Sequence, residues 1–363
     1  MTKEELNFLK RVISFQTTSD NSVEIKKCLE FIKSFILSKA KCKVKLFVKK
    51  GKTSIIFRSG TNCKVSLIGH IDVVPADKKH FKLKIEEEKA FGRGILDMKG
   101  PIAAMVFSFC KLIKDNVPIE LILTSDEETD GHNGIKGIVE KIKINSKIAV
   151  IPDGLSNFNL ITAQKGPIHL FIKSKGKSAH ASKPWNGENA VEKVLTCFNE
   201  IKNKFNLAKS TKDWLPSTSL TQINTQSAIN QIPNSTEICI DLRLTEKEKD
   251  WLKQIEKICK KHNCMITKIR GDGKVFRLKN NFKIINLWKQ NVKAMINREC
   301  TEVISTGASD ARHLPKNTIS ILTSLDGDGA HSENEWIDIH GIKKLELIIE
   351  KFVKEIYQNP NIV

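Results

Sequence analysis

The feature that most constrains the fold is an alternation of helical and strand-like hydrophobic patterns over the first 150 residues. Apolar positions recur at helical spacing over 2–15, 22–39, 100–114 and near 134–142. Runs typical of strands lie at 43–48, 53–58, 64–69, 119–124 and 147–152. Because such alternation buries a sheet between helices, the sequence predicts an α/β fold, with a mixed sheet flanked by helices.

A second pattern begins near Gly166 and interrupts the first. The strand PIHLFIKSKG is followed by a helix, two strands, a helix and a strand, expected at 188–204, 219–226, 236–244, 246–262 and 264–270. This β-α-β-β-α-β order is that of a complete ferredoxin-like α+β domain.

The first pattern resumes after the glycine-rich stretch at 271–273. A helix is expected at 281–296, a strand at 319–323 and a final helix at 341–356. The sequence therefore predicts a discontinuous domain, formed by 1–165 and 274–363, with a second domain, 166–273, inserted in it. The length of 363 residues agrees with two domains, because single cores seldom extend so far.

The net charge of +19 raises the question of a nucleic-acid partner. Only eight of the basic residues are arginine, and the 52 lysines are scattered rather than clustered. Arginine is the residue that reads phosphates and bases bidentately. We therefore expect no nucleic-acid partner, and expect instead that the positive field favours a small anionic substrate.

The sequence also bears on the cellular compartment. No apolar run reaches the roughly 18 residues of a membrane span, so no membrane partner is expected. The start, MTKEELNFLK, lacks the pattern of a secretory signal. The nine cysteines are odd in number, irregularly spaced and without a CxxC pair. This usage predicts free thiols in the reducing cytoplasm.

Acidic and histidine side chains stand at the ends of several expected strands. The segments are SLIGHIDVVP with His70 and Asp72, GRGILDMKG with Asp97, LILTSDEETDG with Glu127 and Glu128, and IAVIPDG with Asp153. Ligands of open α/β sheets bind at the carboxyl ends of strands, so these groups are expected to converge.

Five converging carboxylates would repel one another strongly unless cations neutralise them. Oxygen and imidazole ligands without thiolate suit zinc, manganese or cobalt, and His331 in DGAHSENEW offers a second imidazole. Taken singly, each motif is more often a turn or a helix start. Taken together, the ordered set predicts a site for divalent metal ions.

Across nearly its whole length, the chain resembles the dinuclear zinc exopeptidase family of succinyl-diaminopimelate desuccinylase, acetylornithine deacetylase, aminoacylase and glutamate carboxypeptidase. The motifs that carry the resemblance are GHIDVVP, GRGILDMKGPIAA, TSDEE, GKSAHASKPWNGENA, NQIP, DLRLT, GASDARH and HSENE. The resemblance implies that 1–165 and 274–363 form a catalytic metallohydrolase domain. It implies that 166–273 form a dimerisation or lid domain, and hence a homodimer.

The resemblance also implies a set of metal ligands. His70 and Asp153 look like ligands of one ion, Glu128 and His331 look like ligands of the other, and Asp97 looks like the bridge. Two divalent ions are expected, zinc first, with cobalt or manganese as alternatives. Asp72 would orient the outer nitrogen of His70. A cis peptide bond is implied after Asp97.

Catalytic and substrate roles follow from the same resemblance. Glu127 looks like the general base that activates a metal-bridging water. His180 looks like an oxyanion donor that reaches an active site across a dimer. The expected substrate contacts are Asn230, Arg243, Ser309 and Arg312, the last through a carboxylate. A turn role for Asn230 and a surface role for Arg243 are the alternatives, and Asp310 looks structural.

The aspartate at position 153 does not decide between two classes of substrate. In this family the deacylases and carboxypeptidases tend to carry Glu there, whereas the aminopeptidases and dipeptidases tend to carry Asp. The SDARH loop and the compact inserted domain favour the deacylases. We therefore expect hydrolysis of an amide bond in a small N-acyl amino acid or peptide, with an aminopeptidase or dipeptidase as the alternative. A non-catalytic binding protein is the remote third possibility, because all expected ligands and Glu127 are present.

Overall fold

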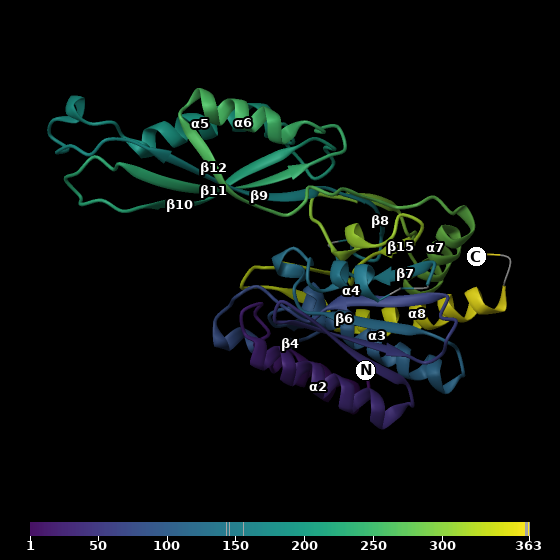
Figure 1. Ribbon diagram of the computed structural model, residues 1–363. Helices are drawn as coiled ribbons and strands as arrows, with labels where there is room; N and C mark the ends of the chain where they lie inside the picture. Colours follow the sequence, from purple (N-terminus) through teal and green to yellow (C-terminus); the bar gives the residue numbers. More distant parts are fainter. Residues whose placement is uncertain (143, 145, 155, 360–361, 363) are drawn as a thin grey trace. The chain divides into compact units, whose positions relative to one another are not determined.

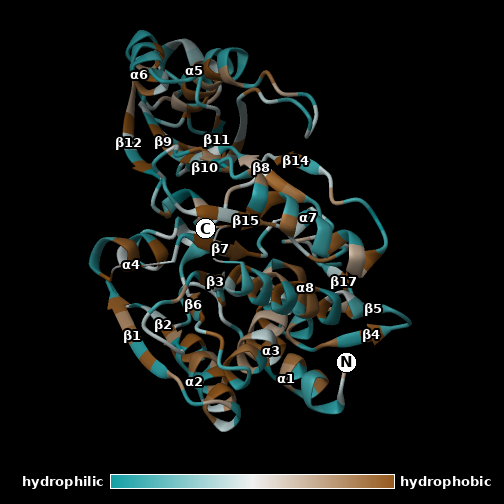
Figure 2. Cartoon of the chain, turned by 90° about the vertical axis from the view of Figure 1, so that its right-hand side faces the viewer, coloured by the Kyte–Doolittle hydropathy of each residue, from teal (hydrophilic) through white to brown (hydrophobic). Residues whose placement is uncertain are grey.

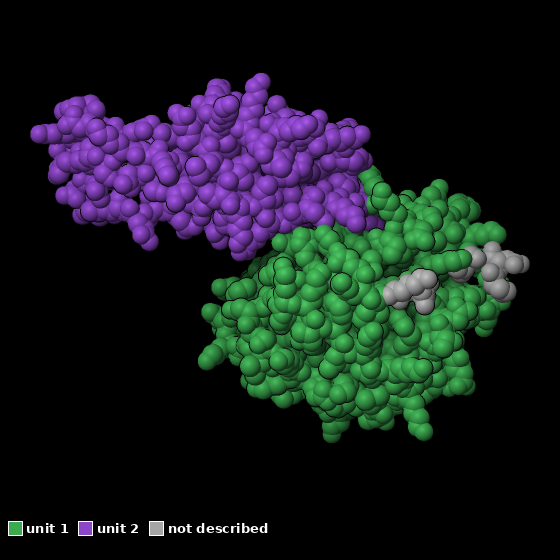
Figure 3. Space-filling model, in the orientation of Figure 1, with its two compact units in different colours: residues 1–162, 277–303, 309–363 green, residues 163–276, 304–308 purple. Residues whose placement is uncertain are grey.

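The structure is a computed structural model that describes residues 1–142, 144, 146–154, 156–359 and 362. The chain forms two compact units (Figure 3). Unit 1 comprises Met1–Thr162, Arg277–Val303 and Ser309–Val363, and unit 2 comprises Ala163–Phe276 and Ile304–Ala308. Residues 304–308, which the sequence assigned to the discontinuous domain, are thus counted with unit 2.

Among the described residues, a mixed sheet of nine strands lies largely in unit 1 (Figure 1). Its order runs β1 (Lys43–Lys49), β2 (Lys52–Arg58), β6 (Glu120–Thr124), β3 (Val65–His70), β7 (Ile148–Ile151), β15 (Ile319–Leu322), β8 (Leu160–Gln164) and β13 (Phe276–Arg277), with β14 (Glu302–Ser305) paired to β8. The four neighbours β6, β3, β7 and β15 are parallel. Their carboxyl ends therefore meet at one edge of the sheet.

These four strands are buried on both faces, and β7 and β15 appear as hydrophobic ribbons in Figure 2. Alternate strand residues share one large core with the helices α1 (Lys3–Ser14), α2 (Ser22–Lys39), α3 (Gly100–Lys114), α7 (Phe282–Ile296) and α8 (Ile339–Gln358). Ile135 and Ile138 of α4 (Ile135–Lys141) are buried outside that core. The predicted mixed sheet with flanking helices is confirmed.

The helix α3 shows why these residues form a helix at the centre of unit 1. Pro101 stands in its first turn, where a missing N–H costs nothing. Twelve of its residues are buried, because α3 packs against α1, α8 and the sheet. A helix that is apolar all round is suited to such a position.

A small antiparallel sheet joins two segments of the sequence, one shortly before α3 and the other directly before α8. It runs β16 (Gly327–Asp328), β17 (Trp336–Asp338), β5 (Lys89–Phe91) and β4 (Lys84–Glu86). The pairing sets Trp336 opposite Phe91, so two segments far apart in sequence become neighbours. The sequence did not predict these short strands.

Unit 2 contains β9 (Gly166–Lys175), α5 (Ala190–Phe205), β10 (Ser217–Thr225), β11 (Ser235–Leu244), α6 (Trp251–Lys261) and β12 (Cys264–Arg270). The strands form an antiparallel sheet of order β10-β11-β9-β12, and α5 and α6 lie on one of its faces (Figure 1). Apolar residues of both helices and of the sheet form a core of their own. The observed element order is the one that the sequence predicted.

Among the described residues, no helix is both long and apolar enough to cross a bilayer.

Candidate metal centre

The carboxyl edge of the parallel strands gathers the predicted ligands within unit 1. His70 is the last residue of β3, Glu127 and Glu128 follow β6, and Asp153 follows β7. Asp97 lies in the tight turn Ile95–Lys99 that leads into α3, and the peptide bond between Asp97 and Met98 is cis, as the resemblance implied. The expected convergence of these segments is confirmed.

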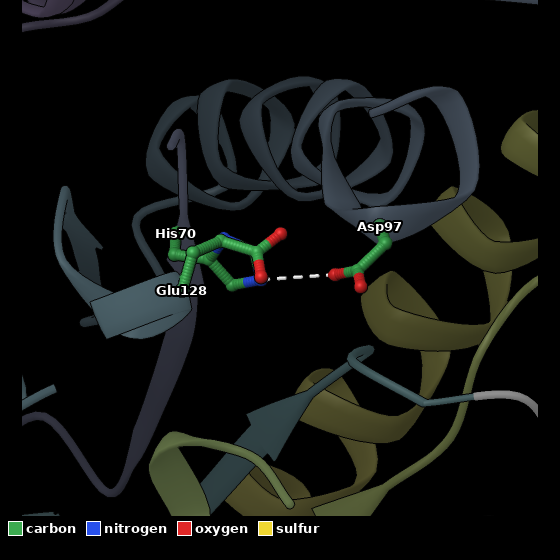
Figure 4. A group of neighbouring side chains, drawn as sticks. All are labelled: His70, Asp97 and Glu128. Carbon is green, nitrogen blue, oxygen red and sulfur yellow. Dashed lines mark hydrogen bonds and ion pairs between the residues drawn. The ribbon is translucent and has the colours of Figure 1, made fainter. Parts of the chain in front are cut away.

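Asp97 stands between two imidazoles, one for each of its carboxylate oxygens. Its Oδ1 lies 3.0 Å from His70 Nε2, and its Oδ2 lies 3.1 Å from His331 Nε2. Figure 4 shows the carboxylate of Asp97 facing the His70 ring, with Glu128 beside that ring. A carboxylate in this position is arranged to bridge two cations.

The two remaining carboxylates divide between the two histidines. Glu128 Oε1 lies 3.2 Å from His331 Nε2, whereas Asp153 Oδ2 lies 3.9 Å from His70 Nε2. The neighbouring pairs are thus His331 with Glu128 and His70 with Asp153. These are the pairs that the family resemblance assigned to separate ions, and the assignment itself stays a prediction.

Two carboxylates of this centre, those of Glu128 and Asp153, are largely buried. Burial raises the pKa of Glu128 to about 7. Burial, and then the charge of Asp97, raises the pKa of Asp153 well above its usual range. The hydrogen bonds to Asp97 and then to Glu128 raise the pKa of His331 to about 10. Without a cation, the centre therefore retains protons that a bound metal ion would replace.

The donor set fits divalent metal ions. One ligand atom each from His70, Asp97 and Glu128 lie within 4.8 Å of one another. Asp153 Oδ2 is buried and makes no hydrogen bond within the described part of the chain. Carboxylate oxygens and imidazole nitrogens without thiolate suit zinc, manganese or cobalt.

Asp72 fixes the orientation of His70, although chiefly through its backbone. His70 Nδ1 lies 3.0 Å from the carbonyl oxygen of Asp72 and 3.6 Å from its Oδ1. The other oxygen, Oδ2, accepts hydrogen bonds from Ser19 Oγ at 2.9 Å and from the Glu128 backbone N–H at 3.2 Å. A carbonyl acceptor at Nδ1 holds the proton of that nitrogen, so that Nε2, which faces Asp97 and Asp153, is the nitrogen left to bind a metal ion.

Glu127 points to a different partner from Glu128. Its Oε1 lies 3.4 Å from Arg312 Nη1. Burial raises the pKa of Glu127, and the positive charges of His70 and Arg312 oppose this shift. The residue next to a predicted ligand is therefore a largely buried carboxylate that lies beside a cation.

The GASDARH segment is mostly buried against this part of unit 1. Arg312 donates hydrogen bonds to the carbonyl oxygens of Ser309 at 2.8 Å and Asp130 at 3.1 Å. Ser309 is fully buried, and Asp310 accepts a hydrogen bond from Thr124 Oγ1 at 3.0 Å. The predicted substrate contacts of Ser309 and Arg312 stay predictions.

The other predicted site residues belong to unit 2. His180 is exposed, and its Nδ1 accepts a hydrogen bond from the Ser182 backbone N–H at 3.2 Å. The Asn230 carbonyl accepts a hydrogen bond from the Ala181 N–H at 2.8 Å, so the two predicted segments are neighbours. Arg243 donates hydrogen bonds from Nε and Nη2 to Asp241, at 2.7 and 2.8 Å.

Two buried residues that the sequence reasoning missed lie against the metal centre. Glu335 accepts a hydrogen bond from the Asp97 backbone N–H at 3.1 Å, and Arg93 pairs with Glu335 at 2.9 Å. Both belong to motifs that carried the resemblance, GRGILDMKG and HSENE. Their roles depend on contacts between distant segments, for which the sequence gives no periodic signal.

Comparisons with known proteins agree with this geometry. A sequence model described as Peptidase family M20/M25/M40 matches residues 66–355. A succinyl-diaminopimelate desuccinylase of Rickettsia bellii is 26% identical over 377 residues, which cover 96% of this chain and 95% of that protein.

Solved structures share the fold at lower identity. A metallo-carboxypeptidase of Sulfolobus solfataricus superposes with a TM-score of 0.82 and 18% identity, covering 97% of this chain and 99% of that one. A di-peptidase of Saccharomyces cerevisiae gives a TM-score of 0.78 and 16% identity, covering 99% and 96%.

Proposed function

This chain belongs to peptidase family M20/M25/M40, and from that premise we propose that it hydrolyses the amide bond of a small N-acyl amino acid at a centre of two divalent ions. The observation that carries the proposal is Asp97, whose two oxygens each face one histidine. Glu127, the predicted base, adjoins this centre in sequence and is buried beside Arg312.

The ligand roles follow the neighbouring pairs. His70 and Asp153 would hold one ion, Glu128 and His331 the other, and Asp97 both. Such ions would lower the pKa of a water molecule towards about 7 and polarise the amide carbonyl. Zinc is the ion we propose, since the ligands are imidazoles and carboxylates, with cobalt and manganese as alternatives.

Glu127 is the general base of the proposed reaction. Burial raises the pKa of Glu127 above its usual value, which makes the carboxylate a stronger proton acceptor. The carboxylate takes a proton from the attacking water and delivers it to the leaving amine. Arg312 orients the carboxylate of Glu127 in this proposal. The alternative role of Arg312 is the predicted one, in which its guanidinium binds a carboxylate of the substrate.

We propose that unit 2 is a ferredoxin-like lid and dimerisation domain and that His180 acts across the dimer. Because Nδ1 accepts the Ser182 N–H, the neutral ring carries its proton on Nε2, where it can be donated to a developing oxyanion. The strand β10 supports a homodimer, since it forms one edge of its sheet and Gln222–Thr225 are exposed. Asn230 and Arg243 are proposed to contact the substrate from this unit.

For the substrate, we place N-succinyl and N-acetyl amino acids first. The curated relatives named succinyl-diaminopimelate desuccinylase support this choice, since they match over nearly the full chain. Asp153 favours the aminopeptidase or dipeptidase alternative. The excess of positive charge suits an anionic small molecule better than a nucleic acid or membrane. Nine free thiols, eight of them buried, support a cytoplasmic location.

A substrate panel tests the proposal. The metal-loaded full chain is assayed against N-succinyl and N-acetyl amino acids and against unblocked dipeptides. Turnover of the acylated compounds supports the deacylase, and turnover of the free-amine dipeptides alone would replace it with the dipeptidase. Inactivity on every compound, with metal bound, would favour the remote binding-protein reading.

A further inference from the structure

The backbone of the turn that carries Asp97 donates hydrogen bonds to one buried carboxylate, that of Glu335. Glu335 Oε1 accepts hydrogen bonds from the backbone N–H groups of Leu96 at 2.9 Å and Asp97 at 3.1 Å. Glu335 Oε2 accepts hydrogen bonds from the Gly94 N–H at 2.8 Å and from Arg93 Nη1 at 2.9 Å. Four donors thus converge on two oxygens of a side chain that is only 2% exposed.

The position of Glu335 follows from the small sheet. Trp336 pairs with Phe91 across β17 and β5, and the Gly92 N–H donates to the Glu335 carbonyl at 3.4 Å. This register directs the Glu335 side chain towards the turn that starts at Gly94. The same glutamate lies four residues after His331, so it connects the segments of two proposed ligands.

Arg93 completes the connection. It is 4% exposed, and its second guanidinium nitrogen, Nη2, donates a hydrogen bond to the His331 carbonyl at 3.3 Å. His331 has a φ of +65°, a backbone region that a non-glycine residue adopts at a cost. A hydrogen bond to its carbonyl therefore helps to fix a strained residue whose imidazole faces Asp97.

We infer that the buried pair Arg93–Glu335 is a positioning device that sets Asp97 and His331 at the spacing that metal binding requires. This inference rests on the proposed function, since it concerns the same metal centre. Neither residue touches the reacting atoms. Glu335 accepts hydrogen bonds from backbone N–H groups on both sides of Leu96, and Arg93 connects Glu335 to the His331 carbonyl. The pair thereby sets the distance of 3.1 Å between Asp97 Oδ2 and His331 Nε2.

The arrangement requires a carboxylate in particular. A glutamine in place of Glu335 would keep one acceptor oxygen and turn an NH2 group towards two of the four donors. Its shape is nearly unchanged, so the change acts on the hydrogen bonds rather than on packing. Outer residues that orient metal ligands typically change metal affinity by about 10- to 100-fold when replaced.

The test uses the full chain, freed of metal by chelation and titrated with Co²⁺ while its visible absorption is recorded. Glu335→Gln is compared with Glu333→Gln, which removes the same charge from an exposed residue of the same segment. We expect Co²⁺ affinity to fall about 10- to 100-fold in Glu335→Gln and to stay at the wild-type value in Glu333→Gln. Activity of Glu335→Gln should recover as the metal concentration rises.

The outcomes separate the two proposals. Wild-type protein that binds no Co²⁺ would overturn the proposed function, whereas equal affinity in wild type and a folded Glu335→Gln would overturn the positioning role alone. Circular dichroism verifies folding of each variant. If Glu335→Gln does not fold, Arg93→Lys takes its place, because lysine keeps the charge but cannot bond Glu335 and the His331 carbonyl with two fixed nitrogens. Unchanged Co²⁺ affinity and spectrum in Arg93→Lys would then contradict the inference.

Discussion

Arg312 Nη1 lies 3.4 Å from Glu127 Oε1, although the two residues are 185 positions apart in the chain. The guanidinium is fixed by two carbonyl oxygens, those of Ser309 and Asp130, so it offers Glu127 a cation in a set position. Burial raises the pKa of Glu127, and Arg312 works against that shift. The contact therefore helps to keep the proposed base ionised near neutral pH.

Replacing Arg312 by Met should shift the acidic limb of the pH profile of kcat/KM to higher pH. The variant loses the charge that lowers the pKa of Glu127, so a higher pH is needed to ionise the base. Arg312→Lys, which keeps a positive charge, should shift the limb less. A rise in KM with an unchanged pH profile would instead assign Arg312 to substrate binding.

The neighbours Glu127 and Glu128 should respond differently to the same substitution. We expect Glu127→Gln to retain its metal ions but to lose roughly 100- to 10,000-fold in kcat, the usual contribution of a general base. Glu128→Gln should lose metal, because its carboxylate faces His331. Metal analysis after dialysis and steady-state kinetics measure both effects. The reverse pattern would exchange the two roles.

Much of the fold could be predicted because local periodicity agreed with tertiary structure. The helices 22–39 and 100–114 and the strand 264–270 match the structure residue for residue. The helix expected from 246 begins only at Trp251. There the Glu248 carboxylate accepts hydrogen bonds from the backbone N–H and the hydroxyl of Thr245, which stabilise a turn that hydrophobic spacing does not reveal.

The candidate site, like the fold, could be predicted from the sequence only in part. His70, Glu128 and Asp153 could be expected to converge because they follow parallel strands, whose ends share an edge. The residues that contact the backbone of the other two proposed ligands, Asp97 and His331, could not be predicted in this way. Arg93 and Glu335 are 242 residues apart and meet only through the pairing of β5 with β17, which are three residues each. Asp72 was expected to orient the outer nitrogen of His70, and this nitrogen lies closer to the carbonyl oxygen of Asp72 than to its carboxylate.

Mixing two inactive variants tests whether His180 acts across a dimer. His180→Ala should reduce kcat roughly 100- to 1,000-fold, as loss of an oxyanion donor does. In a heterodimer of His180→Ala with Glu127→Gln, one site would combine an intact Glu127 with an intact His180 from the other subunit. Activity should then appear on mixing and subunit exchange. Failure of exchanged heterodimers to regain activity, or a monomeric mass by light scattering, would contradict the dimer role.

Metal removal should leave a chain whose stability falls as pH rises. In the metal-free protein the folded-state pKa of Glu128 is raised from 4.5 to about 7, and that of His331 from 6.5 to about 10. A carboxyl group with a raised pKa destabilises the fold as it ionises above pH 4.5. A histidine with a raised pKa contributes stability below pH 6.5 that is lost as pH rises towards 10.

Both effects lower the stability of the metal-free chain as pH rises, that of Glu128 from pH 4.5 to about 7 and that of His331 from pH 6.5 to about 10. Metal binding opposes both, because the ion requires deprotonated ligands. The increase in Tm on adding Zn²⁺ to the chelated protein should therefore be larger at pH 8.5 than at pH 5.5. Differential scanning calorimetry at the two pH values measures it, with Glu128→Gln as the variant in which the difference shrinks. An equal increase in Tm at both pH values in wild type would show that these two groups do not bind the ion.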